Sequence, residues 1–447
     1  MTVIRNITKS LGFKAILLGI MILLMLIPVV LVREVVKERA RRAEQVEREI
    51  LDAWGGELKF AGPVLRIPCR ETRENITRDG EGKVTRETIA RDYSLWVTPA
   101  NLEIRTDLTT REKSRGIFSV PVYSGDLLFT GRFDPSEALA GLTKEQEAFT
   151  GQAEVVLVLS SQKGIRSLES ARWGEDPLDF KPGDQGFGLL AGGIHAPAPF
   201  SGGESRDFRI GLAVQGGRQI RILPLGEQTR VGVNSDWPAP SFQGEYLPDS
   251  RELDEAGFQA LWNISYLSRG IPLFWSDGGR DASDPEEALR RAFFGVDFLK
   301  VLDHYALNER AVKYTILFII VPFLTLFLME IFWKREIHPV QYLLAGIGNV
   351  VFYLLLLSIS EHIPFNLAYL VSALAVTLMM CLYSRSLLAG WRESWFMAPV
   401  MGLSYLYLFI TLQSEDWALL IGSVGAFTIT GLVMFVTRKV NWYGDSI

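Results

Sequence analysis

Residues 339–360 read PVQYLLAGIGNVVFYLLLLSIS, a stretch without a charged side chain. A helix rises about 1.5 Å per residue and the hydrocarbon core of a bilayer is about 30 Å thick, so about 20 apolar residues cross it. This stretch is therefore long enough to span a membrane as a helix. Five other stretches of the chain are equally apolar and free of charge: residues 15–32, 314–329, 363–384, 394–414 and 417–437.

Five of the six stretches lie in the last third of the chain, whereas the first stands alone near its start. This arrangement predicts a membrane α-helical bundle of six transmembrane helices. Helix 15–32 comes first, and a five-helix bundle over 314–437 follows a long polar segment. Only 314–329 is short, and it needs the flanking apolar residues 331–333 to cross the bilayer.

Two other interpretations of these stretches fit less well: the core of a soluble protein, and, for residues 15–32, a cleaved signal peptide. A soluble core would leave five long uncharged runs without a polar face for water. A cleaved signal peptide has a shorter apolar run and small residues at its cleavage site. The sequence VREVVKERARRAEQ, which begins at Val32, has no such pattern. We therefore expect residues 15–32 to remain as a membrane helix.

Charged residues in the connections predict the orientation. Basic residues occupy alternate connections, at Lys334, Arg335, Arg385, Arg392, Arg438 and Lys439. Because connections rich in Lys and Arg face the cytoplasm, we expect a cytoplasmic N-terminus (1–14) and a cytoplasmic tail (438–447). Residues 33–313 then lie in the periplasm. The flank of the first helix gives a weaker signal, because acidic and basic residues alternate after residue 32.

The polar segment 33–313 is long enough for a substantial core and has mainly the pattern of β-strands. Its start differs, because apolar residues recur at helical spacing over 34–53 and predict a helical stalk. The continuous apolar run 155–159 predicts a central strand. Alternation over 208–222, with a Gly-Gly pair between two arms, predicts a hairpin. Residues 168–206, rich in Gly and Pro, predict a long loop.

Three short patterns recur in the same order within the polar segment. They are E-x-[ST]-R at Glu112 and Glu227, F-x-G-x-[FY]-x-P at Phe129 and Phe242, and [KR]-G-I at Lys163 and Arg269. The recurrence fits either chance or a duplication into two β-sandwich-like units over 94–165 and 208–271, with Gly131 and Gly244 at equivalent positions. We interpret F-x-G-x-[FY]-x-P as strand packing in preference to a ligand groove.

Established catalytic patterns are absent from the sequence: it has no P-loop, H-E-x-x-H, G-x-S-x-G, dinucleotide fingerprint or C-x-x-C. Of four scattered histidines, only His195 and His304 lie in the polar segment as candidate bases. We therefore expect no enzyme, no cofactor and no metal centre. The formal net charge of −5, without a basic stripe, argues against nucleic acid as a partner.

The helix 339–360 carries a stripe of polar residues. At 100° per residue, one narrow face presents Tyr342, Gly346, Asn349, Tyr353 and Ser360, and Glu361 and His362 follow. Polar side chains at membrane depth face protein or a cavity. The stripe is thus either a polar route or pocket that ends at Glu361 and His362, or a set of interhelical hydrogen bonds. We prefer the second interpretation, because no charge lies at its centre.

Several long strings resemble the CreD family of bacterial inner-membrane proteins. They include VNSDWPAPSFQGEYLP (233–248), LDHYALNERAVKY (302–314), RAVKYTILF (310–318), IHPVQYLL (337–344), LLLLSISEHIPFNLAYL (354–370), SEDWALLIGS (414–423) and TRKVNWY (437–443). The resemblance covers nearly the whole chain. It implies a Gram-negative inner-membrane protein linked to cell-envelope integrity and to the Cre two-component regulatory system, and it supplies no catalytic residues.

We therefore expect a multi-pass inner-membrane protein that supports the envelope and its tolerance of stress. Its partners are the lipid bilayer and an unknown envelope component or membrane protein, which we expect the periplasmic domain to bind. The alternative is a small transporter or lipid-handling protein, in which the polar stripe lines a route through the bundle.

Overall fold

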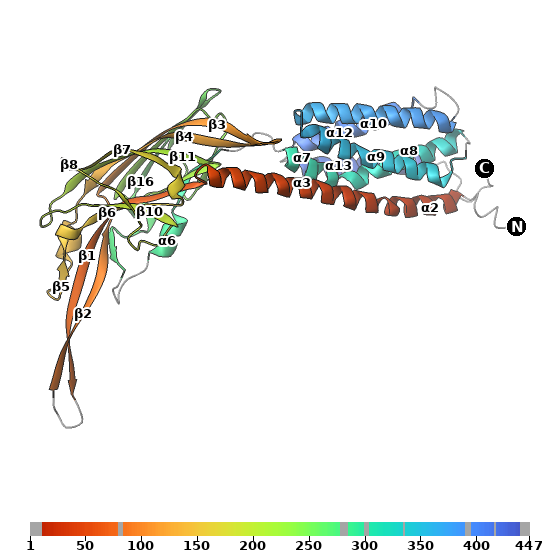
Figure 1. Cartoon of the computed structure of the whole chain (residues 1–447). Coiled ribbons are helices and arrows are strands. Elements are labelled where there is room, and N and C mark those ends of the chain that lie inside the picture. The colour runs from red at the N-terminus through yellow and green to blue at the C-terminus, as the bar shows by residue number, and fades with distance from the viewer. Residues whose placement is uncertain are drawn as a thin grey trace. The chain divides into compact units, whose positions relative to one another are not determined.

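The structure is a computed structural model that describes residues 11–78, 84–277, 285–298, 304–333, 336–388, 395–414 and 417–438. The chain divides into two compact units (Figure 1). One is helical and consists of Met1–Glu44 with Leu302–Ile447. The other is rich in β-strands and consists of Gln45–Val301. Residues 33–44 and 302–313 therefore belong to the helical unit.

Long apolar helices form the helical unit. Its elements are α2 (Leu11–Leu24), α3 (Leu26–Ala53, which ends in the other unit), α7 (His304–Lys313), α8 (Thr315–Trp333), α9 (Pro339–Ser360), α10 (Phe365–Leu388), α12 (Met397–Gln413) and α13 (Ala418–Thr437). Within the described residues, four helices are long and apolar enough to cross a membrane: Gly12–Ala53, Thr315–Trp333, Pro339–Ser360 and Phe365–Leu387. Two shorter apolar helices are Met397–Gln413 and Leu420–Phe435. Several membrane helices are thus confirmed, and the number six stays a prediction.

Local sequence explains where α9 begins. Pro339 occupies the first turn of α9, where its missing N–H is harmless. His338 caps the helix: its Nδ1 accepts from the Val340 N–H (3.3 Å), and the Gln341 side chain accepts from the His338 N–H (2.8 Å).

Many apolar side chains of the helical unit stay exposed, among them Phe427 at 81%. Acyl chains solvate such a surface, whereas water does not.

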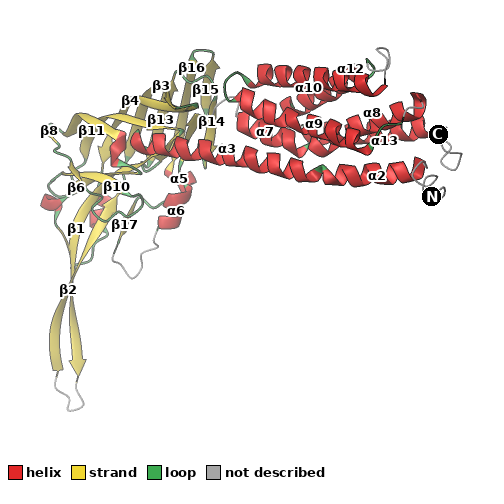
Figure 2. Cartoon of the chain, turned by 45° about the vertical axis from the view of Figure 1, so that its right-hand side comes forward, coloured by secondary structure: helices red, strands yellow, loops and turns green. Residues whose placement is uncertain are grey.

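The β-rich unit is a sandwich of two sheets (Figure 2). The first sheet runs in the order β14 (Pro240–Gly244), β18 (Phe294–Phe298), β12 (Gln219–Leu223), β1 (Leu58–Arg78), β6 (Glu154–Leu159), β10 (Gly192–Pro197) and β9 (Lys181–Pro182). Attached to it are β2 (Val84–Val97), β5 (Gln146–Ala148) and β17 (Phe274–Ser276).

The second sheet runs in the order β15 (Ser250–Asp254), β16 (Gly257–Ser265), β13 (Gln228–Ser235), β3 (Asn101–Arg115), β4 (Phe118–Phe133), β11 (Arg206–Gly217), β7 (Ile165–Trp173) and β8 (Asp176–Pro177). Short helices lie in the connections: α4 (Ser136–Ala140), α5 (Tyr266–Arg269), α6 (Glu286–Arg291) and the 3-10 turns Thr150–Gln152 and Gln162–Gly164.

Two hydrophobic clusters hold the sandwich together. The larger lies between the sheets, where the rings of Phe60 and Phe129 stand 6.3 Å apart. The smaller covers the other face of the first sheet and includes Trp96 of β2 and Leu289 of α6. Because both faces of the first sheet are covered, β6 is buried along 155–159. The predicted central strand is confirmed.

Parallel pairing joins the first half of the β-rich unit to its second half. In the first sheet β1 runs parallel to β12, and Leu58 lies opposite Ile220. In the second sheet β3 runs parallel to β13, and Leu102 lies opposite Thr229. Each sheet therefore needs strands from both halves of the chain segment.

A long hairpin of β1 and β2 extends from the β-rich unit (Figures 1 and 2). β5 pairs with β1 at residues 69–71, and β17 pairs with β2 at residues 95–97. Beyond these points, residues 73–78 and 84–89 pair only with each other among the described residues. We call these residues the β1–β2 arm.

The hairpin predicted over 208–222 is wrong. β11 pairs with β4 and β7 in the second sheet, whereas β12 pairs with β1 and β18 in the first. The Gly-Gly pair lets the chain cross between sheets at close range, because a Cβ on Gly216 would lie 2.7 Å from the Tyr123 hydroxyl. Arg218 completes the crossing with a left-handed φ of 65°.

The predicted long loop over 168–206 is also wrong in part. Most of β7 and all of β10 lie inside it. β10 pairs with the buried strand β6 from Gly192 to Pro197. Pairing with this neighbour makes residues 192–197 a strand, although their Gly and Pro content alone predicts a loop.

The two segments of the predicted duplication, 94–165 and 208–271, do not form separate units. Each contributes strands to both sheets around one shared core. Gly131 lies in β4, between β3 and β11 in the second sheet, whereas Gly244 ends β14, which pairs with β18 in the first. Their predicted equivalence is therefore wrong.

Candidate functional site

The centre of the polar stripe is closed by hydrogen bonds between helices. Asn349, 1% exposed, lies on α9. Its Nδ2 donates to the backbone oxygen of Phe318 on α8 (2.6 Å), and its Oδ1 accepts from the Tyr405 hydroxyl on α12 (2.9 Å). Both polar ends of the amide are thus engaged by neighbouring helices, as an amide in an apolar environment requires.

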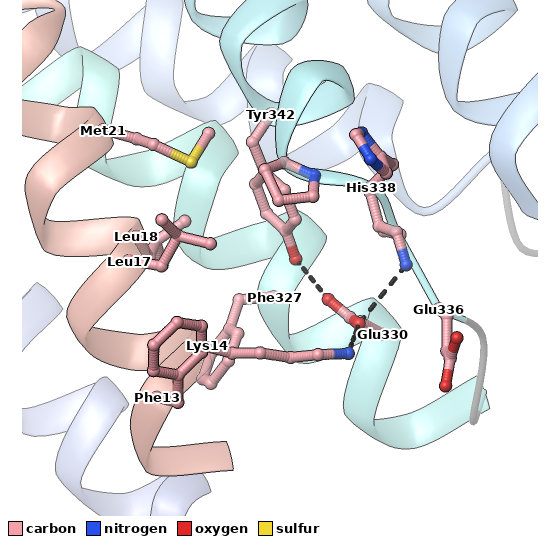
Figure 3. A pocket seen from close by; sticks show the side chains of 12 residues that line it. Phe13, Lys14, Leu17, Leu18, Met21, Phe327, Glu330, Glu336, His338 and Tyr342 are labelled. Carbon is pink, nitrogen blue, oxygen red and sulfur yellow. Dashed lines mark hydrogen bonds and ion pairs between the residues drawn. The ribbon is translucent and has the colours of Figure 1, made fainter. Parts of the chain in front are cut away.

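The N-terminal end of the stripe contains a buried charge pair (Figure 3). The Tyr342 hydroxyl donates to Oε2 of Glu330 (2.7 Å). Oε1 of the same carboxylate accepts from Lys14 Nζ (2.5 Å) and from the Ile337 N–H (3.3 Å). Glu330 is 2% exposed, so its charge is compensated by one ammonium group and two further donors.

The C-terminal end of the stripe connects α9 to α7 and α3. Ser360 Oγ accepts from Asn308 Nδ2 of α7 (2.9 Å). Oε1 of Glu361 accepts from the Tyr305 hydroxyl (3.2 Å) and lies 3.9 Å from Nε of Arg39 on α3. These contacts join α3, α7 and α9.

Tyr353 and His362, also predicted for this site, have different surroundings. Tyr353 is 1% exposed and packs against the ring of Phe352, with centroids 5.0 Å apart. Among the described residues its hydroxyl makes no hydrogen bond of normal geometry. His362 is exposed beyond the end of α9. The stripe is therefore mainly a set of packing contacts, and a functional role for it stays a prediction.

Comparisons with known proteins identify the family. A family model described as "Inner membrane protein CreD" matches residues 10–443. The chain is 32% identical over 431 residues to inner membrane protein CreD of Escherichia coli (strain K12), an overlap that covers 95% of this chain and 92% of that protein. The chain belongs to the CreD family. With its apolar helices, it is a multi-pass inner-membrane protein.

Sequence reasoning about this family member missed the charge pair of Lys14 and Glu330. Lys14 and Glu330 each lie next to an apolar stretch, 15–32 and 314–329, and outside it. A signal was present, because Glu330 is the one charged residue in the helix Thr315–Trp333. A charge inside a membrane helix predicts a polar partner.

The β-rich unit carries a surface groove of about 530 Å³ over the second sheet. Five carboxylates line it, those of Asp107, Asp126, Asp236, Glu252 and Asp254. Neighbouring groups occupy some of them: Asp236 accepts from the N–H and hydroxyl of Thr110, and Asp107 accepts from Asn234 Nδ2. In the described part of the chain, no three His, Cys, Asp or Glu residues are arranged to hold a metal.

Arg269, from the recurring [KR]-G-I pattern, is a buried structural cation. It is 5% exposed, and its Nη1 donates to the backbone oxygen of Pro224 (2.7 Å). Burial lowers the pKa of its guanidinium to about 10. Nε and Nη2 have no hydrogen-bond partner among the described residues. At Arg269 the pattern therefore marks a packed position, whereas Lys163, at its other occurrence, is exposed.

Proposed function

We propose that this inner-membrane protein supports the integrity of the cell envelope by binding a protein partner through the β1–β2 arm. The helical unit anchors the chain in the bilayer, and the β-rich unit faces the periplasm. The partner in this proposal is an extended polypeptide segment that adds to an edge of the arm.

The unpaired edges of the arm carry this proposal. Beyond residues 69–71 and 95–97, the described outer edges of β1 and β2 have no neighbouring strand. Such edges present rows of N–H and C=O groups to which another chain can pair. Side chains of the arm are exposed as well, including Ile89 at 52%. A bare two-stranded hairpin is only marginally stable in water, so a partner strand would stabilise the arm.

Charge pairs lie at the base of the arm. Arg70 Nε donates to Oδ1 of Asp92 (2.7 Å), and Arg70 Nη2 donates to Oδ2 (3.2 Å). Arg73 Nη2 lies 2.6 Å from Oε1 of Glu71. Solvent-exposed pairs of this kind contribute little to stability.

A transport function through the polar stripe is the alternative. The hydrogen bonds of Asn349 argue against it, because both polar atoms of this side chain are already engaged by α8 and α12. A solute moving along the stripe would have to break these contacts at the centre of the helical unit.

The experiment shortens the arm and keeps the sandwich. Residues 72–90 are replaced by Asn-Gly, which leaves the pair Glu71–Arg91 to close a two-residue hairpin and retains Arg70 with Asp92. We expect this variant to reach wild-type abundance in the membrane but to fail to restore detergent tolerance to a deletion strain. Asn349→Leu, expressed at a matched level, should restore it. Full restoration by the shortened variant would show that the arm is not the binding surface.

A further inference from the structure

A cavity of about 380 Å³ lies in the helical unit beside the charge pair of Lys14 and Glu330 (Figure 3). The start of α2, the end of α8 and the first turn of α9 surround it. This volume falls within the range of small-molecule sites. It stands at helix ends, where an apolar helix meets the headgroup region of a bilayer.

The walls of the cavity have two chemical characters. One side is apolar and consists of Phe13, Leu17, Leu18, Met21 and Phe327. The other side presents polar groups from Lys14, Glu330, Glu336, His338 and Tyr342. A ligand that fills this space therefore needs an apolar part beside a polar head. Figure 3 shows the polar tips of Lys14, Glu330 and Tyr342 turned toward one another, with the apolar side chains of α2 beside them.

In the cluster of Lys14, Glu330 and Tyr342 the carboxylate is engaged, whereas Lys14 keeps donors. Glu330 already accepts from Lys14, from Tyr342 and from the Ile337 N–H, so its carboxylate is engaged. Lys14 gives one of its three ammonium donors to Glu330, and its side chain keeps 19% exposure. His338 Nδ1 accepts from the Val340 N–H, which leaves Nε2 as the ring nitrogen that can donate. The head that matches these donors is an anionic oxygen group.

The charge of the head follows from the acidic groups in the same cavity. Glu330 compensates Lys14, and Glu336 adds a second carboxylate to the lining. Because two carboxylates and one ammonium group line the cavity, a phosphate diester with a single negative charge fits it better than a doubly charged phosphate monoester. From the cavity, its apolar wall and the fixed ammonium group, we infer that this is a binding site for a membrane phospholipid. Lys14 donates to the phosphate, and an acyl chain lies along α2.

The test uses the delipidated full-length protein in a mild detergent and follows its thermal unfolding. The probes are dioctanoyl phosphatidylglycerol, dioctanoylglycerol without the phosphate, and sodium phosphate without the chains. We expect the phospholipid alone to raise the melting temperature in a saturable manner. Equal stabilisation by dioctanoylglycerol would overturn the role of the phosphate. Stabilisation by sodium phosphate would place a free anion in the cavity and overturn the lipid.

Matched variants locate the binding to the cavity. Leu18→Trp fills the apolar wall and leaves Lys14 and Glu330 in place, so half-maximal stabilisation should need at least tenfold more phospholipid. Ile16→Trp lies on the same helix, is 66% exposed and is not part of the lining, so it should bind as the wild type does. A double variant, Lys14→Gln with Glu330→Gln, removes the ammonium group without leaving a buried charge and should also lose binding. Unchanged binding in Leu18→Trp and in the double variant would refute the site.

Discussion

Replacing Asn349 by Leu tests whether the centre of the helical unit is a packed contact. Leu has a similar volume, so the change removes two hydrogen bonds without opening a large cavity. The lost bonds are those to the backbone oxygen of Phe318 (2.6 Å) and from the Tyr405 hydroxyl (2.9 Å). We expect the free energy of unfolding to fall while the protein still folds and reaches the membrane.

The size of the effect follows from the two bonds. Interhelical hydrogen bonds in membrane proteins contribute about 0.6 kcal/mol on average and up to about 1.7 kcal/mol each. The loss for Asn349→Leu should therefore be about 1–3 kcal/mol. The Tyr405 hydroxyl would be left without its acceptor in a buried position, which favours the upper half of this range.

The measurement is unfolding of the full-length protein in detergent, extended to a double-mutant cycle with Tyr405→Phe. The coupling between Asn349 and Tyr405 should be about 0.6–1.7 kcal/mol. Ser423→Ala is the control, because Ser423 is exposed and bonds only to Leu420 of its own helix among the described residues, so it should change stability by less than about 0.5 kcal/mol. A variant of unchanged stability that loses envelope function would refute the packing interpretation.

Three further outcomes test the β-rich unit. Cys69 is 1% exposed, and burial raises the pKa of its thiol to about 11, so its alkylation at pH 8 should be more than about a hundredfold slower than that of a free thiol. The rate should rise with pH toward 11, and rapid labelling of the folded protein at pH 8 would contradict this. Gly244→Ala should destabilise the unit by more than about 2 kcal/mol in thermal unfolding, because φ is 107° and a Cβ would stand 2.2 Å from the Phe293 oxygen. Gly56→Ala is the control, since a Cβ there meets open space, and it should lose about 1–2 kcal/mol. Arg269→Met should be neutral or stabilising, since it removes a buried cation whose Nε and Nη2 are unpaired in the described structure. A loss of several kcal/mol would show that Nε or Nη2 has a partner in addition to the Pro224 oxygen on Nη1.

The membrane helices could be predicted because their cause is local. An uncharged run such as residues 339–360 needs no information from the rest of the chain to favour a bilayer. The strand 155–159 was predictable for the same reason, since a run of five apolar residues is found where both faces of a sheet are covered. The helical stalk over 34–53 follows from spacing alone and is seen in α3.

Sheet membership could not be predicted, because it depends on partners that are distant in the sequence. Residues 208–222 have the alternation of a hairpin, yet β12 pairs with β1 and β18 and not with β11. The charge pair of Lys14 and Glu330 has the same origin, since 316 positions separate its members. The residues of the polar stripe were visible in the sequence, whereas the residues that bond to them, such as Tyr405 and Asn308, come from other helices.

The parallel pairing of β1 with β12 has a consequence for biosynthesis. Leu58 of β1 pairs with Ile220 of β12, which is synthesised about 160 residues later, and β12 in turn pairs with β18. At roughly 5–20 residues per second, ribosomes take on the order of tens of seconds to make the segment from β1 to β18. During that interval an early strand with open edges stays tethered to a helix that has already entered the bilayer. Such a chain has a high contact order and folds slowly, so we expect the newly made protein to depend on chaperones that shield strand edges until its last strand arrives.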